Sequence, residues 1–243
     1  MRSTGRAVPN FNGVRRLFLL VAAVILVDTT FYAAIAPLLP TYADDLGLSK
    51  TASGVLSAAY AAGTLLASIP AGFVAARVGV RPTMLTGLAL LAISSATFAF
   101  GKDIVVLDLA RFAQGVGGAC AWTAGLTWLM VTAPRERRGE VIGSVLAVAI
   151  AGIMLGPVFG GIATVIGPEL VFSAVAVVAI ALALRAAATP SVAPTPPPSA
   201  RAVADSILTR PVLIAFWLVA LPSILSGTFN VLIPLRLDEL GAS

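Results

Sequence analysis

Residues 140–165 read EVIGSVLAVAIAGIMLGPVFGGIATV, and this stretch decides the fold class of the chain. It contains no charged residue after Glu140. A helix that rises about 1.5 Å per residue crosses a hydrocarbon core of about 30 Å within such a length. Its glycines at 152, 156 and 160 are four residues apart, so they share one face of that helix. The stretch therefore predicts a transmembrane helix whose small-residue face packs closely against a neighbour.

The remainder of the chain has the same character. Hydrophobic residues make up 58% of the 243 residues and charged residues 11%, whereas a soluble domain carries about 25% charged residues. So apolar a chain needs lipid as its solvent. We predict an all-α, polytopic membrane protein with apolar spans at 17–39, 52–75, 82–101, 104–131, 140–165, 170–187 and 211–235.

Residue types that are scarce or missing exclude several functions. The chain has no histidine and a single cysteine, Cys120. An internal disulfide, a Cys/His metal cluster and a histidine-based catalytic triad are therefore impossible. No paired carboxylates and no nucleophile–base pair are apparent either. We expect neither an enzyme nor a protein that binds a metal or an organic cofactor.

The arginines predict how the spans are oriented. The first apolar run is too long for a secretory signal and Asp28 interrupts it, which favours a first span. With the N-terminus in the cytoplasm, three basic residues fall on the outer side, Lys50, Lys102 and Arg236. This segregation follows the positive-inside rule, predicts a multi-pass protein of the inner (plasma) membrane, and explains the net charge of +5 without a nucleic-acid partner. The twelve cytoplasmic residues are Arg2, Arg6, Arg15, Arg16, Arg77, Arg81, Arg135, Arg137, Arg138, Arg185, Arg201 and Arg210.

The domain organisation follows from a linker and a repeat. Residues 189–210 are rich in proline and small residues, which predicts an extended cytoplasmic linker between a six-helix half at 1–188 and a further span within 211–243. Asp44-Asp45-Leu46-Gly47 follows Pro40, and Asp238-Glu239-Leu240-Gly241 follows Pro234, at a constant offset of 194 residues. Six crossings separate the two segments, so they indicate parallel repeats, unless two acidic loops resemble each other by chance. We expect the chain to stop after the first span of a second half.

Two charged residues lie inside predicted spans, where each costs about 2.5–3.5 kcal/mol on insertion scales. Asp28 in the first span and Arg111 in the fourth are expected at similar depths, and are therefore candidate partners across the bundle. The functional hypothesis is that Asp28 takes up and releases a proton. The alternatives are a static ion pair, or a local pair between Arg111 and Asp108, which lies one turn earlier.

Three motifs accompany these charges, and ordinary helix packing is the alternative explanation for their glycines. Small residues allow close helix approach, glycines allow a tight turn, and a proline removes a backbone hydrogen bond. The motifs are a fourth-span segment with Arg111, Gln114, Gly115, Gly117 and Gly118, a fifth-span segment with Gly152, Gly156, Pro157, Gly160 and Gly161, and a loop with Gly72, Arg77, Gly79 and Arg81.

Together these segments resemble the major facilitator superfamily, most closely its drug:proton antiporters and efflux permeases. Residues 111–119 resemble the family's R-x-x-Q-G-x-G-[AG]-A motif, and 152–161 its G-x-x-x-G-P-x-x-G-G motif. Asp28, Pro37 and Pro40 resemble its first-span pattern. The loop at 72–81 resembles G-x-L-a-D-r-x-G-r-[KR] with one departure, because Ala76 replaces the aspartate that helps to hold the two halves together.

The resemblance implies proton-coupled export of small molecules by alternating access, with protons as coupling ion, the bilayer as surroundings and a small-molecule substrate at the midplane. Candidate cavity residues are Tyr32, Tyr60, Trp122 and Asn230. Two alternatives stay open. One is an importer or facilitator of the same family, and the other is a truncated, non-transporting protein or a subunit that pairs with other chains.

Overall fold

A computed structural model describes residues 11–194, 199–218, 220, 221 and 225. The chain divides into two compact units, Met1–Pro196 and Pro197–Ser243, which are described separately. Asn230, most of the seventh predicted span beyond residue 218, and the second copy of the acidic repeat lie outside the described residues.

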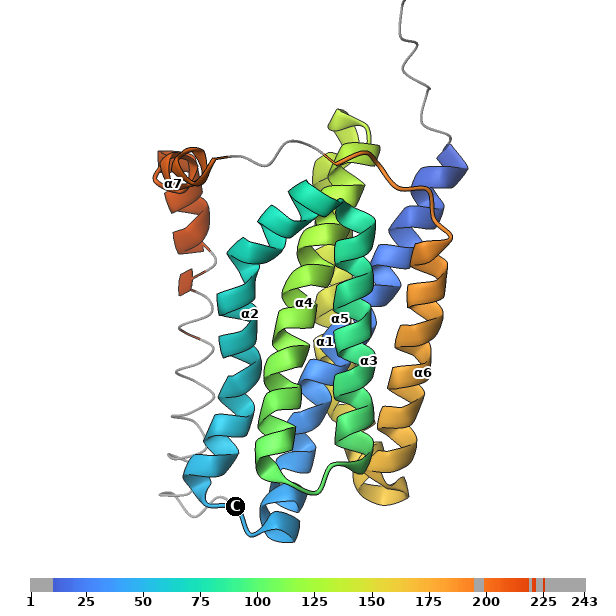
Figure 1. Cartoon of the computed structure of the whole chain (residues 1–243), viewed down its shortest axis with the longest axis vertical. Coiled ribbons are helices and arrows are strands. Elements are labelled where there is room, and N and C mark those ends of the chain that lie inside the picture. The colour runs from blue at the N-terminus through green and yellow to red at the C-terminus, as the bar shows by residue number, and fades with distance from the viewer. Residues whose placement is uncertain (1–10, 195–198, 219, 222–224, 226–243) are drawn as a thin grey trace, which may run out of the picture. The chain divides into compact units, whose positions relative to one another are not determined.

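The first unit is a bundle of six long helices (Figure 1). Each is long enough and apolar enough to cross a membrane. The second unit contains the short helix α7 (Ala200–Ile207), and every regular element in the described part of the chain is helical. The predicted all-α membrane fold is thus confirmed. The bundle consists of α1 (Phe11–Leu46), α2 (Lys50–Val78), α3 (Val80–Phe100), α4 (Ile104–Thr132), the 3-10 turn η1 (Arg135–Arg137), α5 (Arg138–Ile166) and α6 (Pro168–Ala187).

The second to sixth predicted spans agree with α2–α6 to within three residues, whereas α1 begins six residues before and ends seven residues after the first predicted span. We expected that span to end near residue 39, but α1 continues through Pro37 and Pro40 to Leu46. Its stop signal is Gly47, whose φ of +61° is the left-handed conformation that glycine adopts without strain. A proline inside a helix removes one backbone hydrogen bond and crowds the carbonyl four residues earlier, but α1 continues through both prolines.

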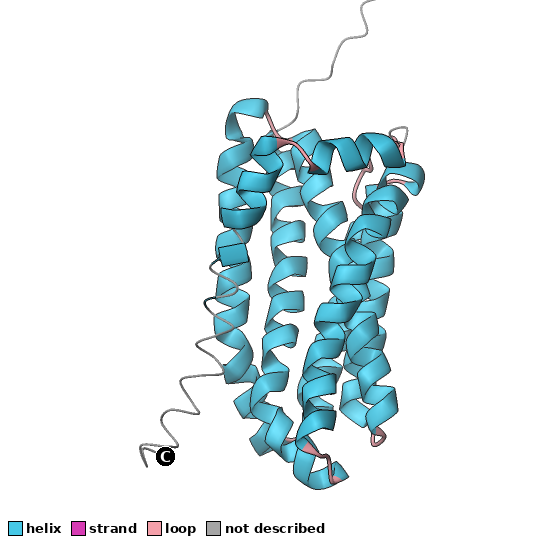
Figure 2. Cartoon of the chain, turned by 90° about the vertical axis from the view of Figure 1, so that its left-hand side faces the viewer, coloured by secondary structure: helices cyan, strands magenta, loops and turns pink. Residues whose placement is uncertain are grey.

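Four pairings organise the bundle. Helix α1 packs along α5, α2 packs along α4, and α3 packs against both α4 and α6. Figure 2 shows the long helices of the bundle from the side, running alongside one another. The core between α1, α3 and α6 contains an aromatic cluster of Phe31, Phe98 and Phe172, whose ring centroids lie 5.2–5.9 Å apart. By contrast, α2, α5 and α6 expose large apolar side chains such as Leu65 and Met154, as expected where hydrocarbon replaces water.

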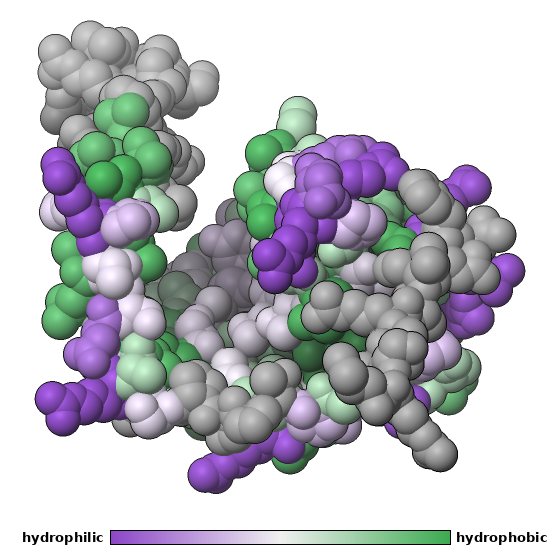
Figure 3. Space-filling model, turned by 90° about the horizontal axis from the view of Figure 1, so that it is seen from above, coloured by the Kyte–Doolittle hydropathy of each residue, from purple (hydrophilic) through white to green (hydrophobic). Residues whose placement is uncertain are grey.

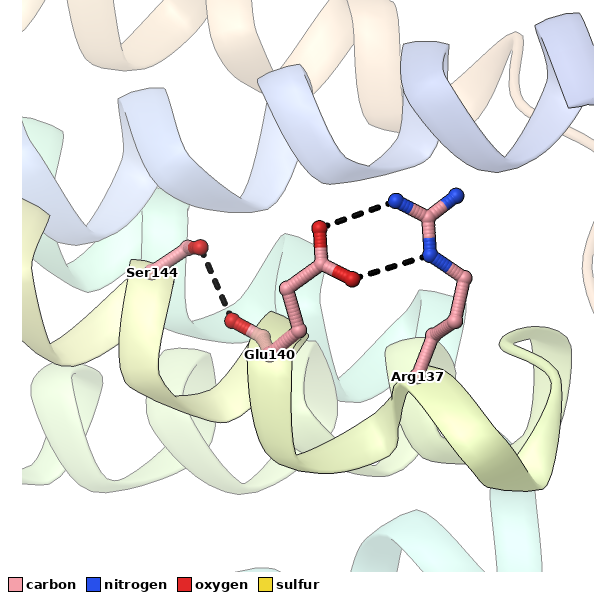
Figure 4. A network of polar contacts seen from close by, with 3 residues as sticks. All are labelled: Arg137, Glu140 and Ser144. Carbon is pink, nitrogen blue, oxygen red and sulfur yellow. Dashed lines mark hydrogen bonds and ion pairs between the residues drawn. The ribbon is translucent and has the colours of Figure 1, made fainter.

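One end of the bundle is basic. It contains the start of α1, the α2–α3 loop, η1 and the end of α6, and hydrophilic residues are visible there when the molecule is seen from above (Figure 3). At the start of α5, Arg137 donates two hydrogen bonds of 2.9 Å to the carboxylate of Glu140, whose backbone carbonyl accepts one from Ser144 at 2.8 Å (Figure 4). This pair is exposed to solvent and contributes little to stability. The arginines of the first unit at this end are Arg15, Arg16, Arg77, Arg81, Arg135, Arg137, Arg138 and Arg185.

Candidate functional site

The centre of the site is the carboxyl group of Asp28, halfway along α1. Only 2% of this residue is exposed. The hydroxyl of Tyr60 on α2 donates to its Oδ2 atom at 3.4 Å, and the Trp122 side chain on α4 is a second hydrogen-bonding neighbour. Gly118 leaves the space that this arrangement needs, because a Cβ atom there would lie 3.0 Å from the Tyr60 hydroxyl and 3.2 Å from Oδ2. Three helices therefore enclose one buried acid.

Arg111 on α4 is almost equally buried, with 3% of the residue exposed. Its Nη1 atom donates to Gln114 Oε1 at 2.6 Å and its Nη2 atom to the backbone carbonyl of Tyr32 at 2.7 Å. The guanidinium carbon also lies 5.2 Å from the ring centroids of both Tyr32 and Tyr60. This is within the range of cation–π attraction. Fixed hydrogen bonds and aromatic faces thus hold the guanidinium on α4 against α1 and α2.

The direct ion pair that we expected between Asp28 and Arg111 is not formed. Among the described residues, the one ion pair within 4.0 Å is the exposed pair at the start of α5. Arg111 and Asp108 therefore form no local ion pair either. The similar depths of Asp28 and Arg111 correctly predicted that the two residues lie in the same region of the bundle. They did not predict contact, because depth does not determine which side chain lies between two helices. Tyr60 contacts both charged groups.

The fourth-span glycines face three different neighbours. A Cβ atom on Gly115 would collide with the backbone carbonyl of Tyr60 on α2. One on Gly117 would lie 2.9 Å from the carbonyl oxygen of Gly87 on α3, and Gly118 faces Asp28. The close approach of neighbouring backbones therefore explains the glycines at 115 and 117. The space taken up by the Asp28 carboxyl group explains the glycine at 118.

The fifth-span glycines form the contact between α5 and α1. Gly152, Gly156 and Gly160 are buried, and α5 runs continuously through Pro157. A Cβ atom on Gly161 would have no neighbour within 4 Å, so this glycine takes no part in the contact. The α1 residues that meet the glycine stripe are Thr29 at Gly152, Ala33 at Gly156, and Ala34 and Pro37 at Gly160.

The α2–α3 loop holds the end of α6. Arg81 Nη1 donates to the carbonyl oxygens of Ala187 at 3.3 Å and Thr189 at 3.5 Å, carbonyls that a helix end leaves without intrahelical partners. Arg77 is exposed. Gly79 has a φ of +100°, and its ψ of 160° completes a conformation that only glycine adopts without strain.

We expect substitutions of the two glycines in the predicted loop motif to differ in their effect on stability, because Gly72 lies inside α2 and Gly79 forms the turn. Gly79→Ala is expected to destabilise the chain by about 1–3 kcal/mol because alanine is strained at this φ and ψ. Gly72→Ala is the matched control: Gly72 is helical and has nothing within 4 Å of a Cβ position. Thermal unfolding of both variants in detergent measures the difference. Equal melting temperatures would contradict the strain assigned to Gly79.

Three of the four candidate cavity residues lie in the described part of the chain. Tyr32 is 39% exposed and its ring centroid lies 4.5 Å from that of Tyr60. Trp122 is half-buried beside Asp28, and Asn230 is outside the described residues. Sequence reasoning missed Thr29, which is buried next to Asp28 and meets Gly152 on α5. A polar residue adjacent to an intramembrane acid was the available signal.

Comparisons with known proteins extend over most of the chain. The model of the Major Facilitator Superfamily matches residues 20–243. The MFS-type transporter ppzB of Metarhizium rileyi is 34% identical over 162 residues, which are 65% of this chain and 32% of that protein. The probable vesicular acetylcholine transporter-B of Danio rerio is 34% identical over 171 residues, covering 66% of this chain and 35% of the relative. The quinolone resistance protein NorA of Staphylococcus aureus is 32% identical over 128 residues, covering 52% and 33%.

Solved structures give the same fold. The proton:xylose symporter XylE bound to 6-bromo-6-deoxy-D-glucose superposes with a TM-score of 0.62 at 18% identity, over 75% of this chain and 46% of the symporter. The matches span about a third of the length of the curated relatives (32%, 35% and 33%). With its family motifs placed in a six-helix bundle of this kind, the chain belongs to the major facilitator superfamily.

Proposed function

We propose that this chain contributes the first half of a proton-coupled exporter of small molecules. In this proposal residues 1–188 are the N-terminal half, 189–210 a cytoplasmic linker, and 211–243 the first helix of a second half. The chain lies in the inner (plasma) membrane with its N-terminus on the cytoplasmic side. The basic end of the bundle supports this orientation.

One observation carries the proton coupling. The carboxyl group of Asp28 is buried, hydrogen-bonded to Tyr60 and without an ion pair within 4.0 Å in the described part of the chain. A buried carboxylate without a direct counter-charge is expensive in a membrane, and one that binds a proton is neutral. Proton uptake and release therefore change the energy of this site in step with its access to water.

The surroundings of Asp28 favour an organic cation as substrate. Tyr60 and Trp122 place aromatic groups beside an acid, which is the combination that attracts ammonium groups. Two relatives are named for substrates of this type. They are the probable vesicular acetylcholine transporter-B of Danio rerio and the synaptic vesicular amine transporter of Bos taurus. Export is supported by the name of a third, the quinolone resistance protein.

Flux measurements on the complete transporter test this function. Inside-out vesicles with an acidic lumen are expected to accumulate the fluorescent cation ethidium and to release protons from the lumen as they do so. Vesicles without the transporter give the background. Accumulation that requires an alkaline lumen would indicate an importer. Accumulation that does not depend on the pH gradient would indicate a facilitator.

A further inference from the structure

Tyr60 lies between the two buried charged groups of the site. We infer that Tyr60 is the positioning residue that couples Asp28 to Arg111, so that the charge of the acid determines how the guanidinium is held. This inference rests on the proposed function, because it assigns a role within the same proton-coupled cycle.

The hydroxyl of Tyr60 faces the acid. It donates to Asp28 Oδ2 at 3.4 Å, longer than the optimum of about 2.7–2.8 Å for such a bond. A charged carboxylate attracts a donor more strongly than a neutral acid does. The bond therefore has room to shorten when Asp28 loses its proton and to lengthen when Asp28 gains one.

The ring of Tyr60 faces the base. Its centroid lies 5.2 Å from the guanidinium carbon of Arg111 and 4.5 Å from the ring of Tyr32, whose backbone carbonyl accepts a hydrogen bond from the same guanidinium. A rigid phenol that touches an acid at one end and a cation along its face transmits movement from one to the other. Tyr60 is thus joined to Asp28 by a hydrogen bond and to Arg111 by a cation–π contact.

The neighbouring glycines restrict which part of Tyr60 can move. Gly115 lies directly against the backbone carbonyl of Tyr60, so the backbone of α2 is held against α4. Gly118 lacks the Cβ atom that would lie 3.0 Å from the Tyr60 hydroxyl, so the hydroxyl is less tightly confined than the backbone. A change in the charge of Asp28 is consequently met by the side chain of Tyr60 rather than by its helix.

Few other charged groups act on this site. The charged residues of α4 are Asp108 and Arg111, and the side chains of Tyr60 and Trp122 lie beside the acid. Tyr32 on α1 faces Tyr60. The charged residues of α3, α5 and α6 all lie in the end turns of their helices, at Arg81, Arg138, Glu140, Glu169 and Arg185.

Two substitutions in the complete transporter separate the hydroxyl from the ring. Tyr60→Phe keeps the ring and removes the donor, so the pH profile of ethidium transport is expected to shift by roughly one unit toward higher pH, with the maximal rate largely kept. Tyr60→Leu also removes the ring under Arg111 and is expected to lower the maximal rate at least about tenfold. Tyr42→Phe removes a phenol hydroxyl that lies 14 residues after Asp28 on α1 and donates to the Phe98 carbonyl, so it is the matched control and should leave the profile unchanged.

The outcomes distinguish this inference from the proposed function. Transport by the unmodified protein that ignores pH would overturn the proposed function itself. A pH-dependent wild type with the same profile in Tyr60→Phe would overturn the coupling role alone. A Tyr60→Phe variant that changes only the concentration of ethidium at half-maximal rate would make Tyr60 a substrate ligand instead. The Tyr60→Phe comparison decides the matter even where Tyr60→Leu does not fold.

Discussion

Replacing Asp28 with asparagine is expected to reduce proton-driven transport by the complete protein to the level of vesicles without transporter. Asparagine has nearly the same volume as aspartate, and its carbonyl oxygen still accepts a hydrogen bond from Tyr60. It cannot bind or release a proton at physiological pH, so the site would remain permanently neutral. Because removing a buried charge lowers the cost of burial, the variant should fold at least as stably as the parent.

The measurement is ethidium flux and luminal pH recorded together in inside-out vesicles. Asp44→Asn is the matched control, because Asp44 lies on the same helix but is exposed near its end. The control should retain both fluxes. Full proton-coupled transport by Asp28→Asn would remove the role assigned to this acid, and downhill exchange of ethidium that persists without proton movement would support it.

Gly156→Leu is expected to destabilise the bundle by about 1–3 kcal/mol or more, through overpacking between α5 and α1. A Cβ atom at Gly156 would meet the side chain of Ala33 and lie 2.9 Å from its Cα atom. That contact is with backbone, so no side-chain rotation relieves it and the two helices must move apart. Helix α1 also contains Asp28, so any variant that folds should transport poorly.

Gly161→Leu provides the control on the same helix. Gly161 belongs to the same sequence motif but has open space at its Cβ position, so leucine is expected to change stability by less than about 0.5 kcal/mol. Melting temperatures in detergent compare the two variants directly. Equal destabilisation by both substitutions would mean that propensity or lipid contact, rather than the α1–α5 contact, explains the glycines.

Most of the fold was predictable because its determinants are local. Long apolar runs predicted six helices, and the turns at Gly101–Asp103 and Gly167 lie between the predicted spans. Asp103 even supplies its own helix cap by accepting hydrogen bonds from two backbone amides at 2.9 and 3.1 Å. The end of α1 was predicted too early because the apolar run stops near Pro40, whereas the helix continues to Leu46 and stops at Gly47, which has a positive φ.

The candidate site was predictable only as a set of residues. The high cost of burying a charge inside a membrane identified Asp28 and Arg111 as candidates. The four-residue spacing of the glycines identified the face of α5 that packs against another helix. Their contacts depend on how α1, α2 and α4 are rotated about their axes, which no single helix determines. For this reason the sequence suggested a direct ion pair where the structure has Tyr60, and grouped Gly161 with three glycines whose contact it does not share.

The length of α1 has a mechanical consequence. The helix has 36 residues, Phe11–Leu46, or about 54 Å at about 1.5 Å per residue, so it extends beyond a hydrocarbon core of about 30 Å. Asp28 lies at its midpoint. A tilt of the whole helix by about 10° about this midpoint would displace its two ends by about 5 Å each, in opposite directions.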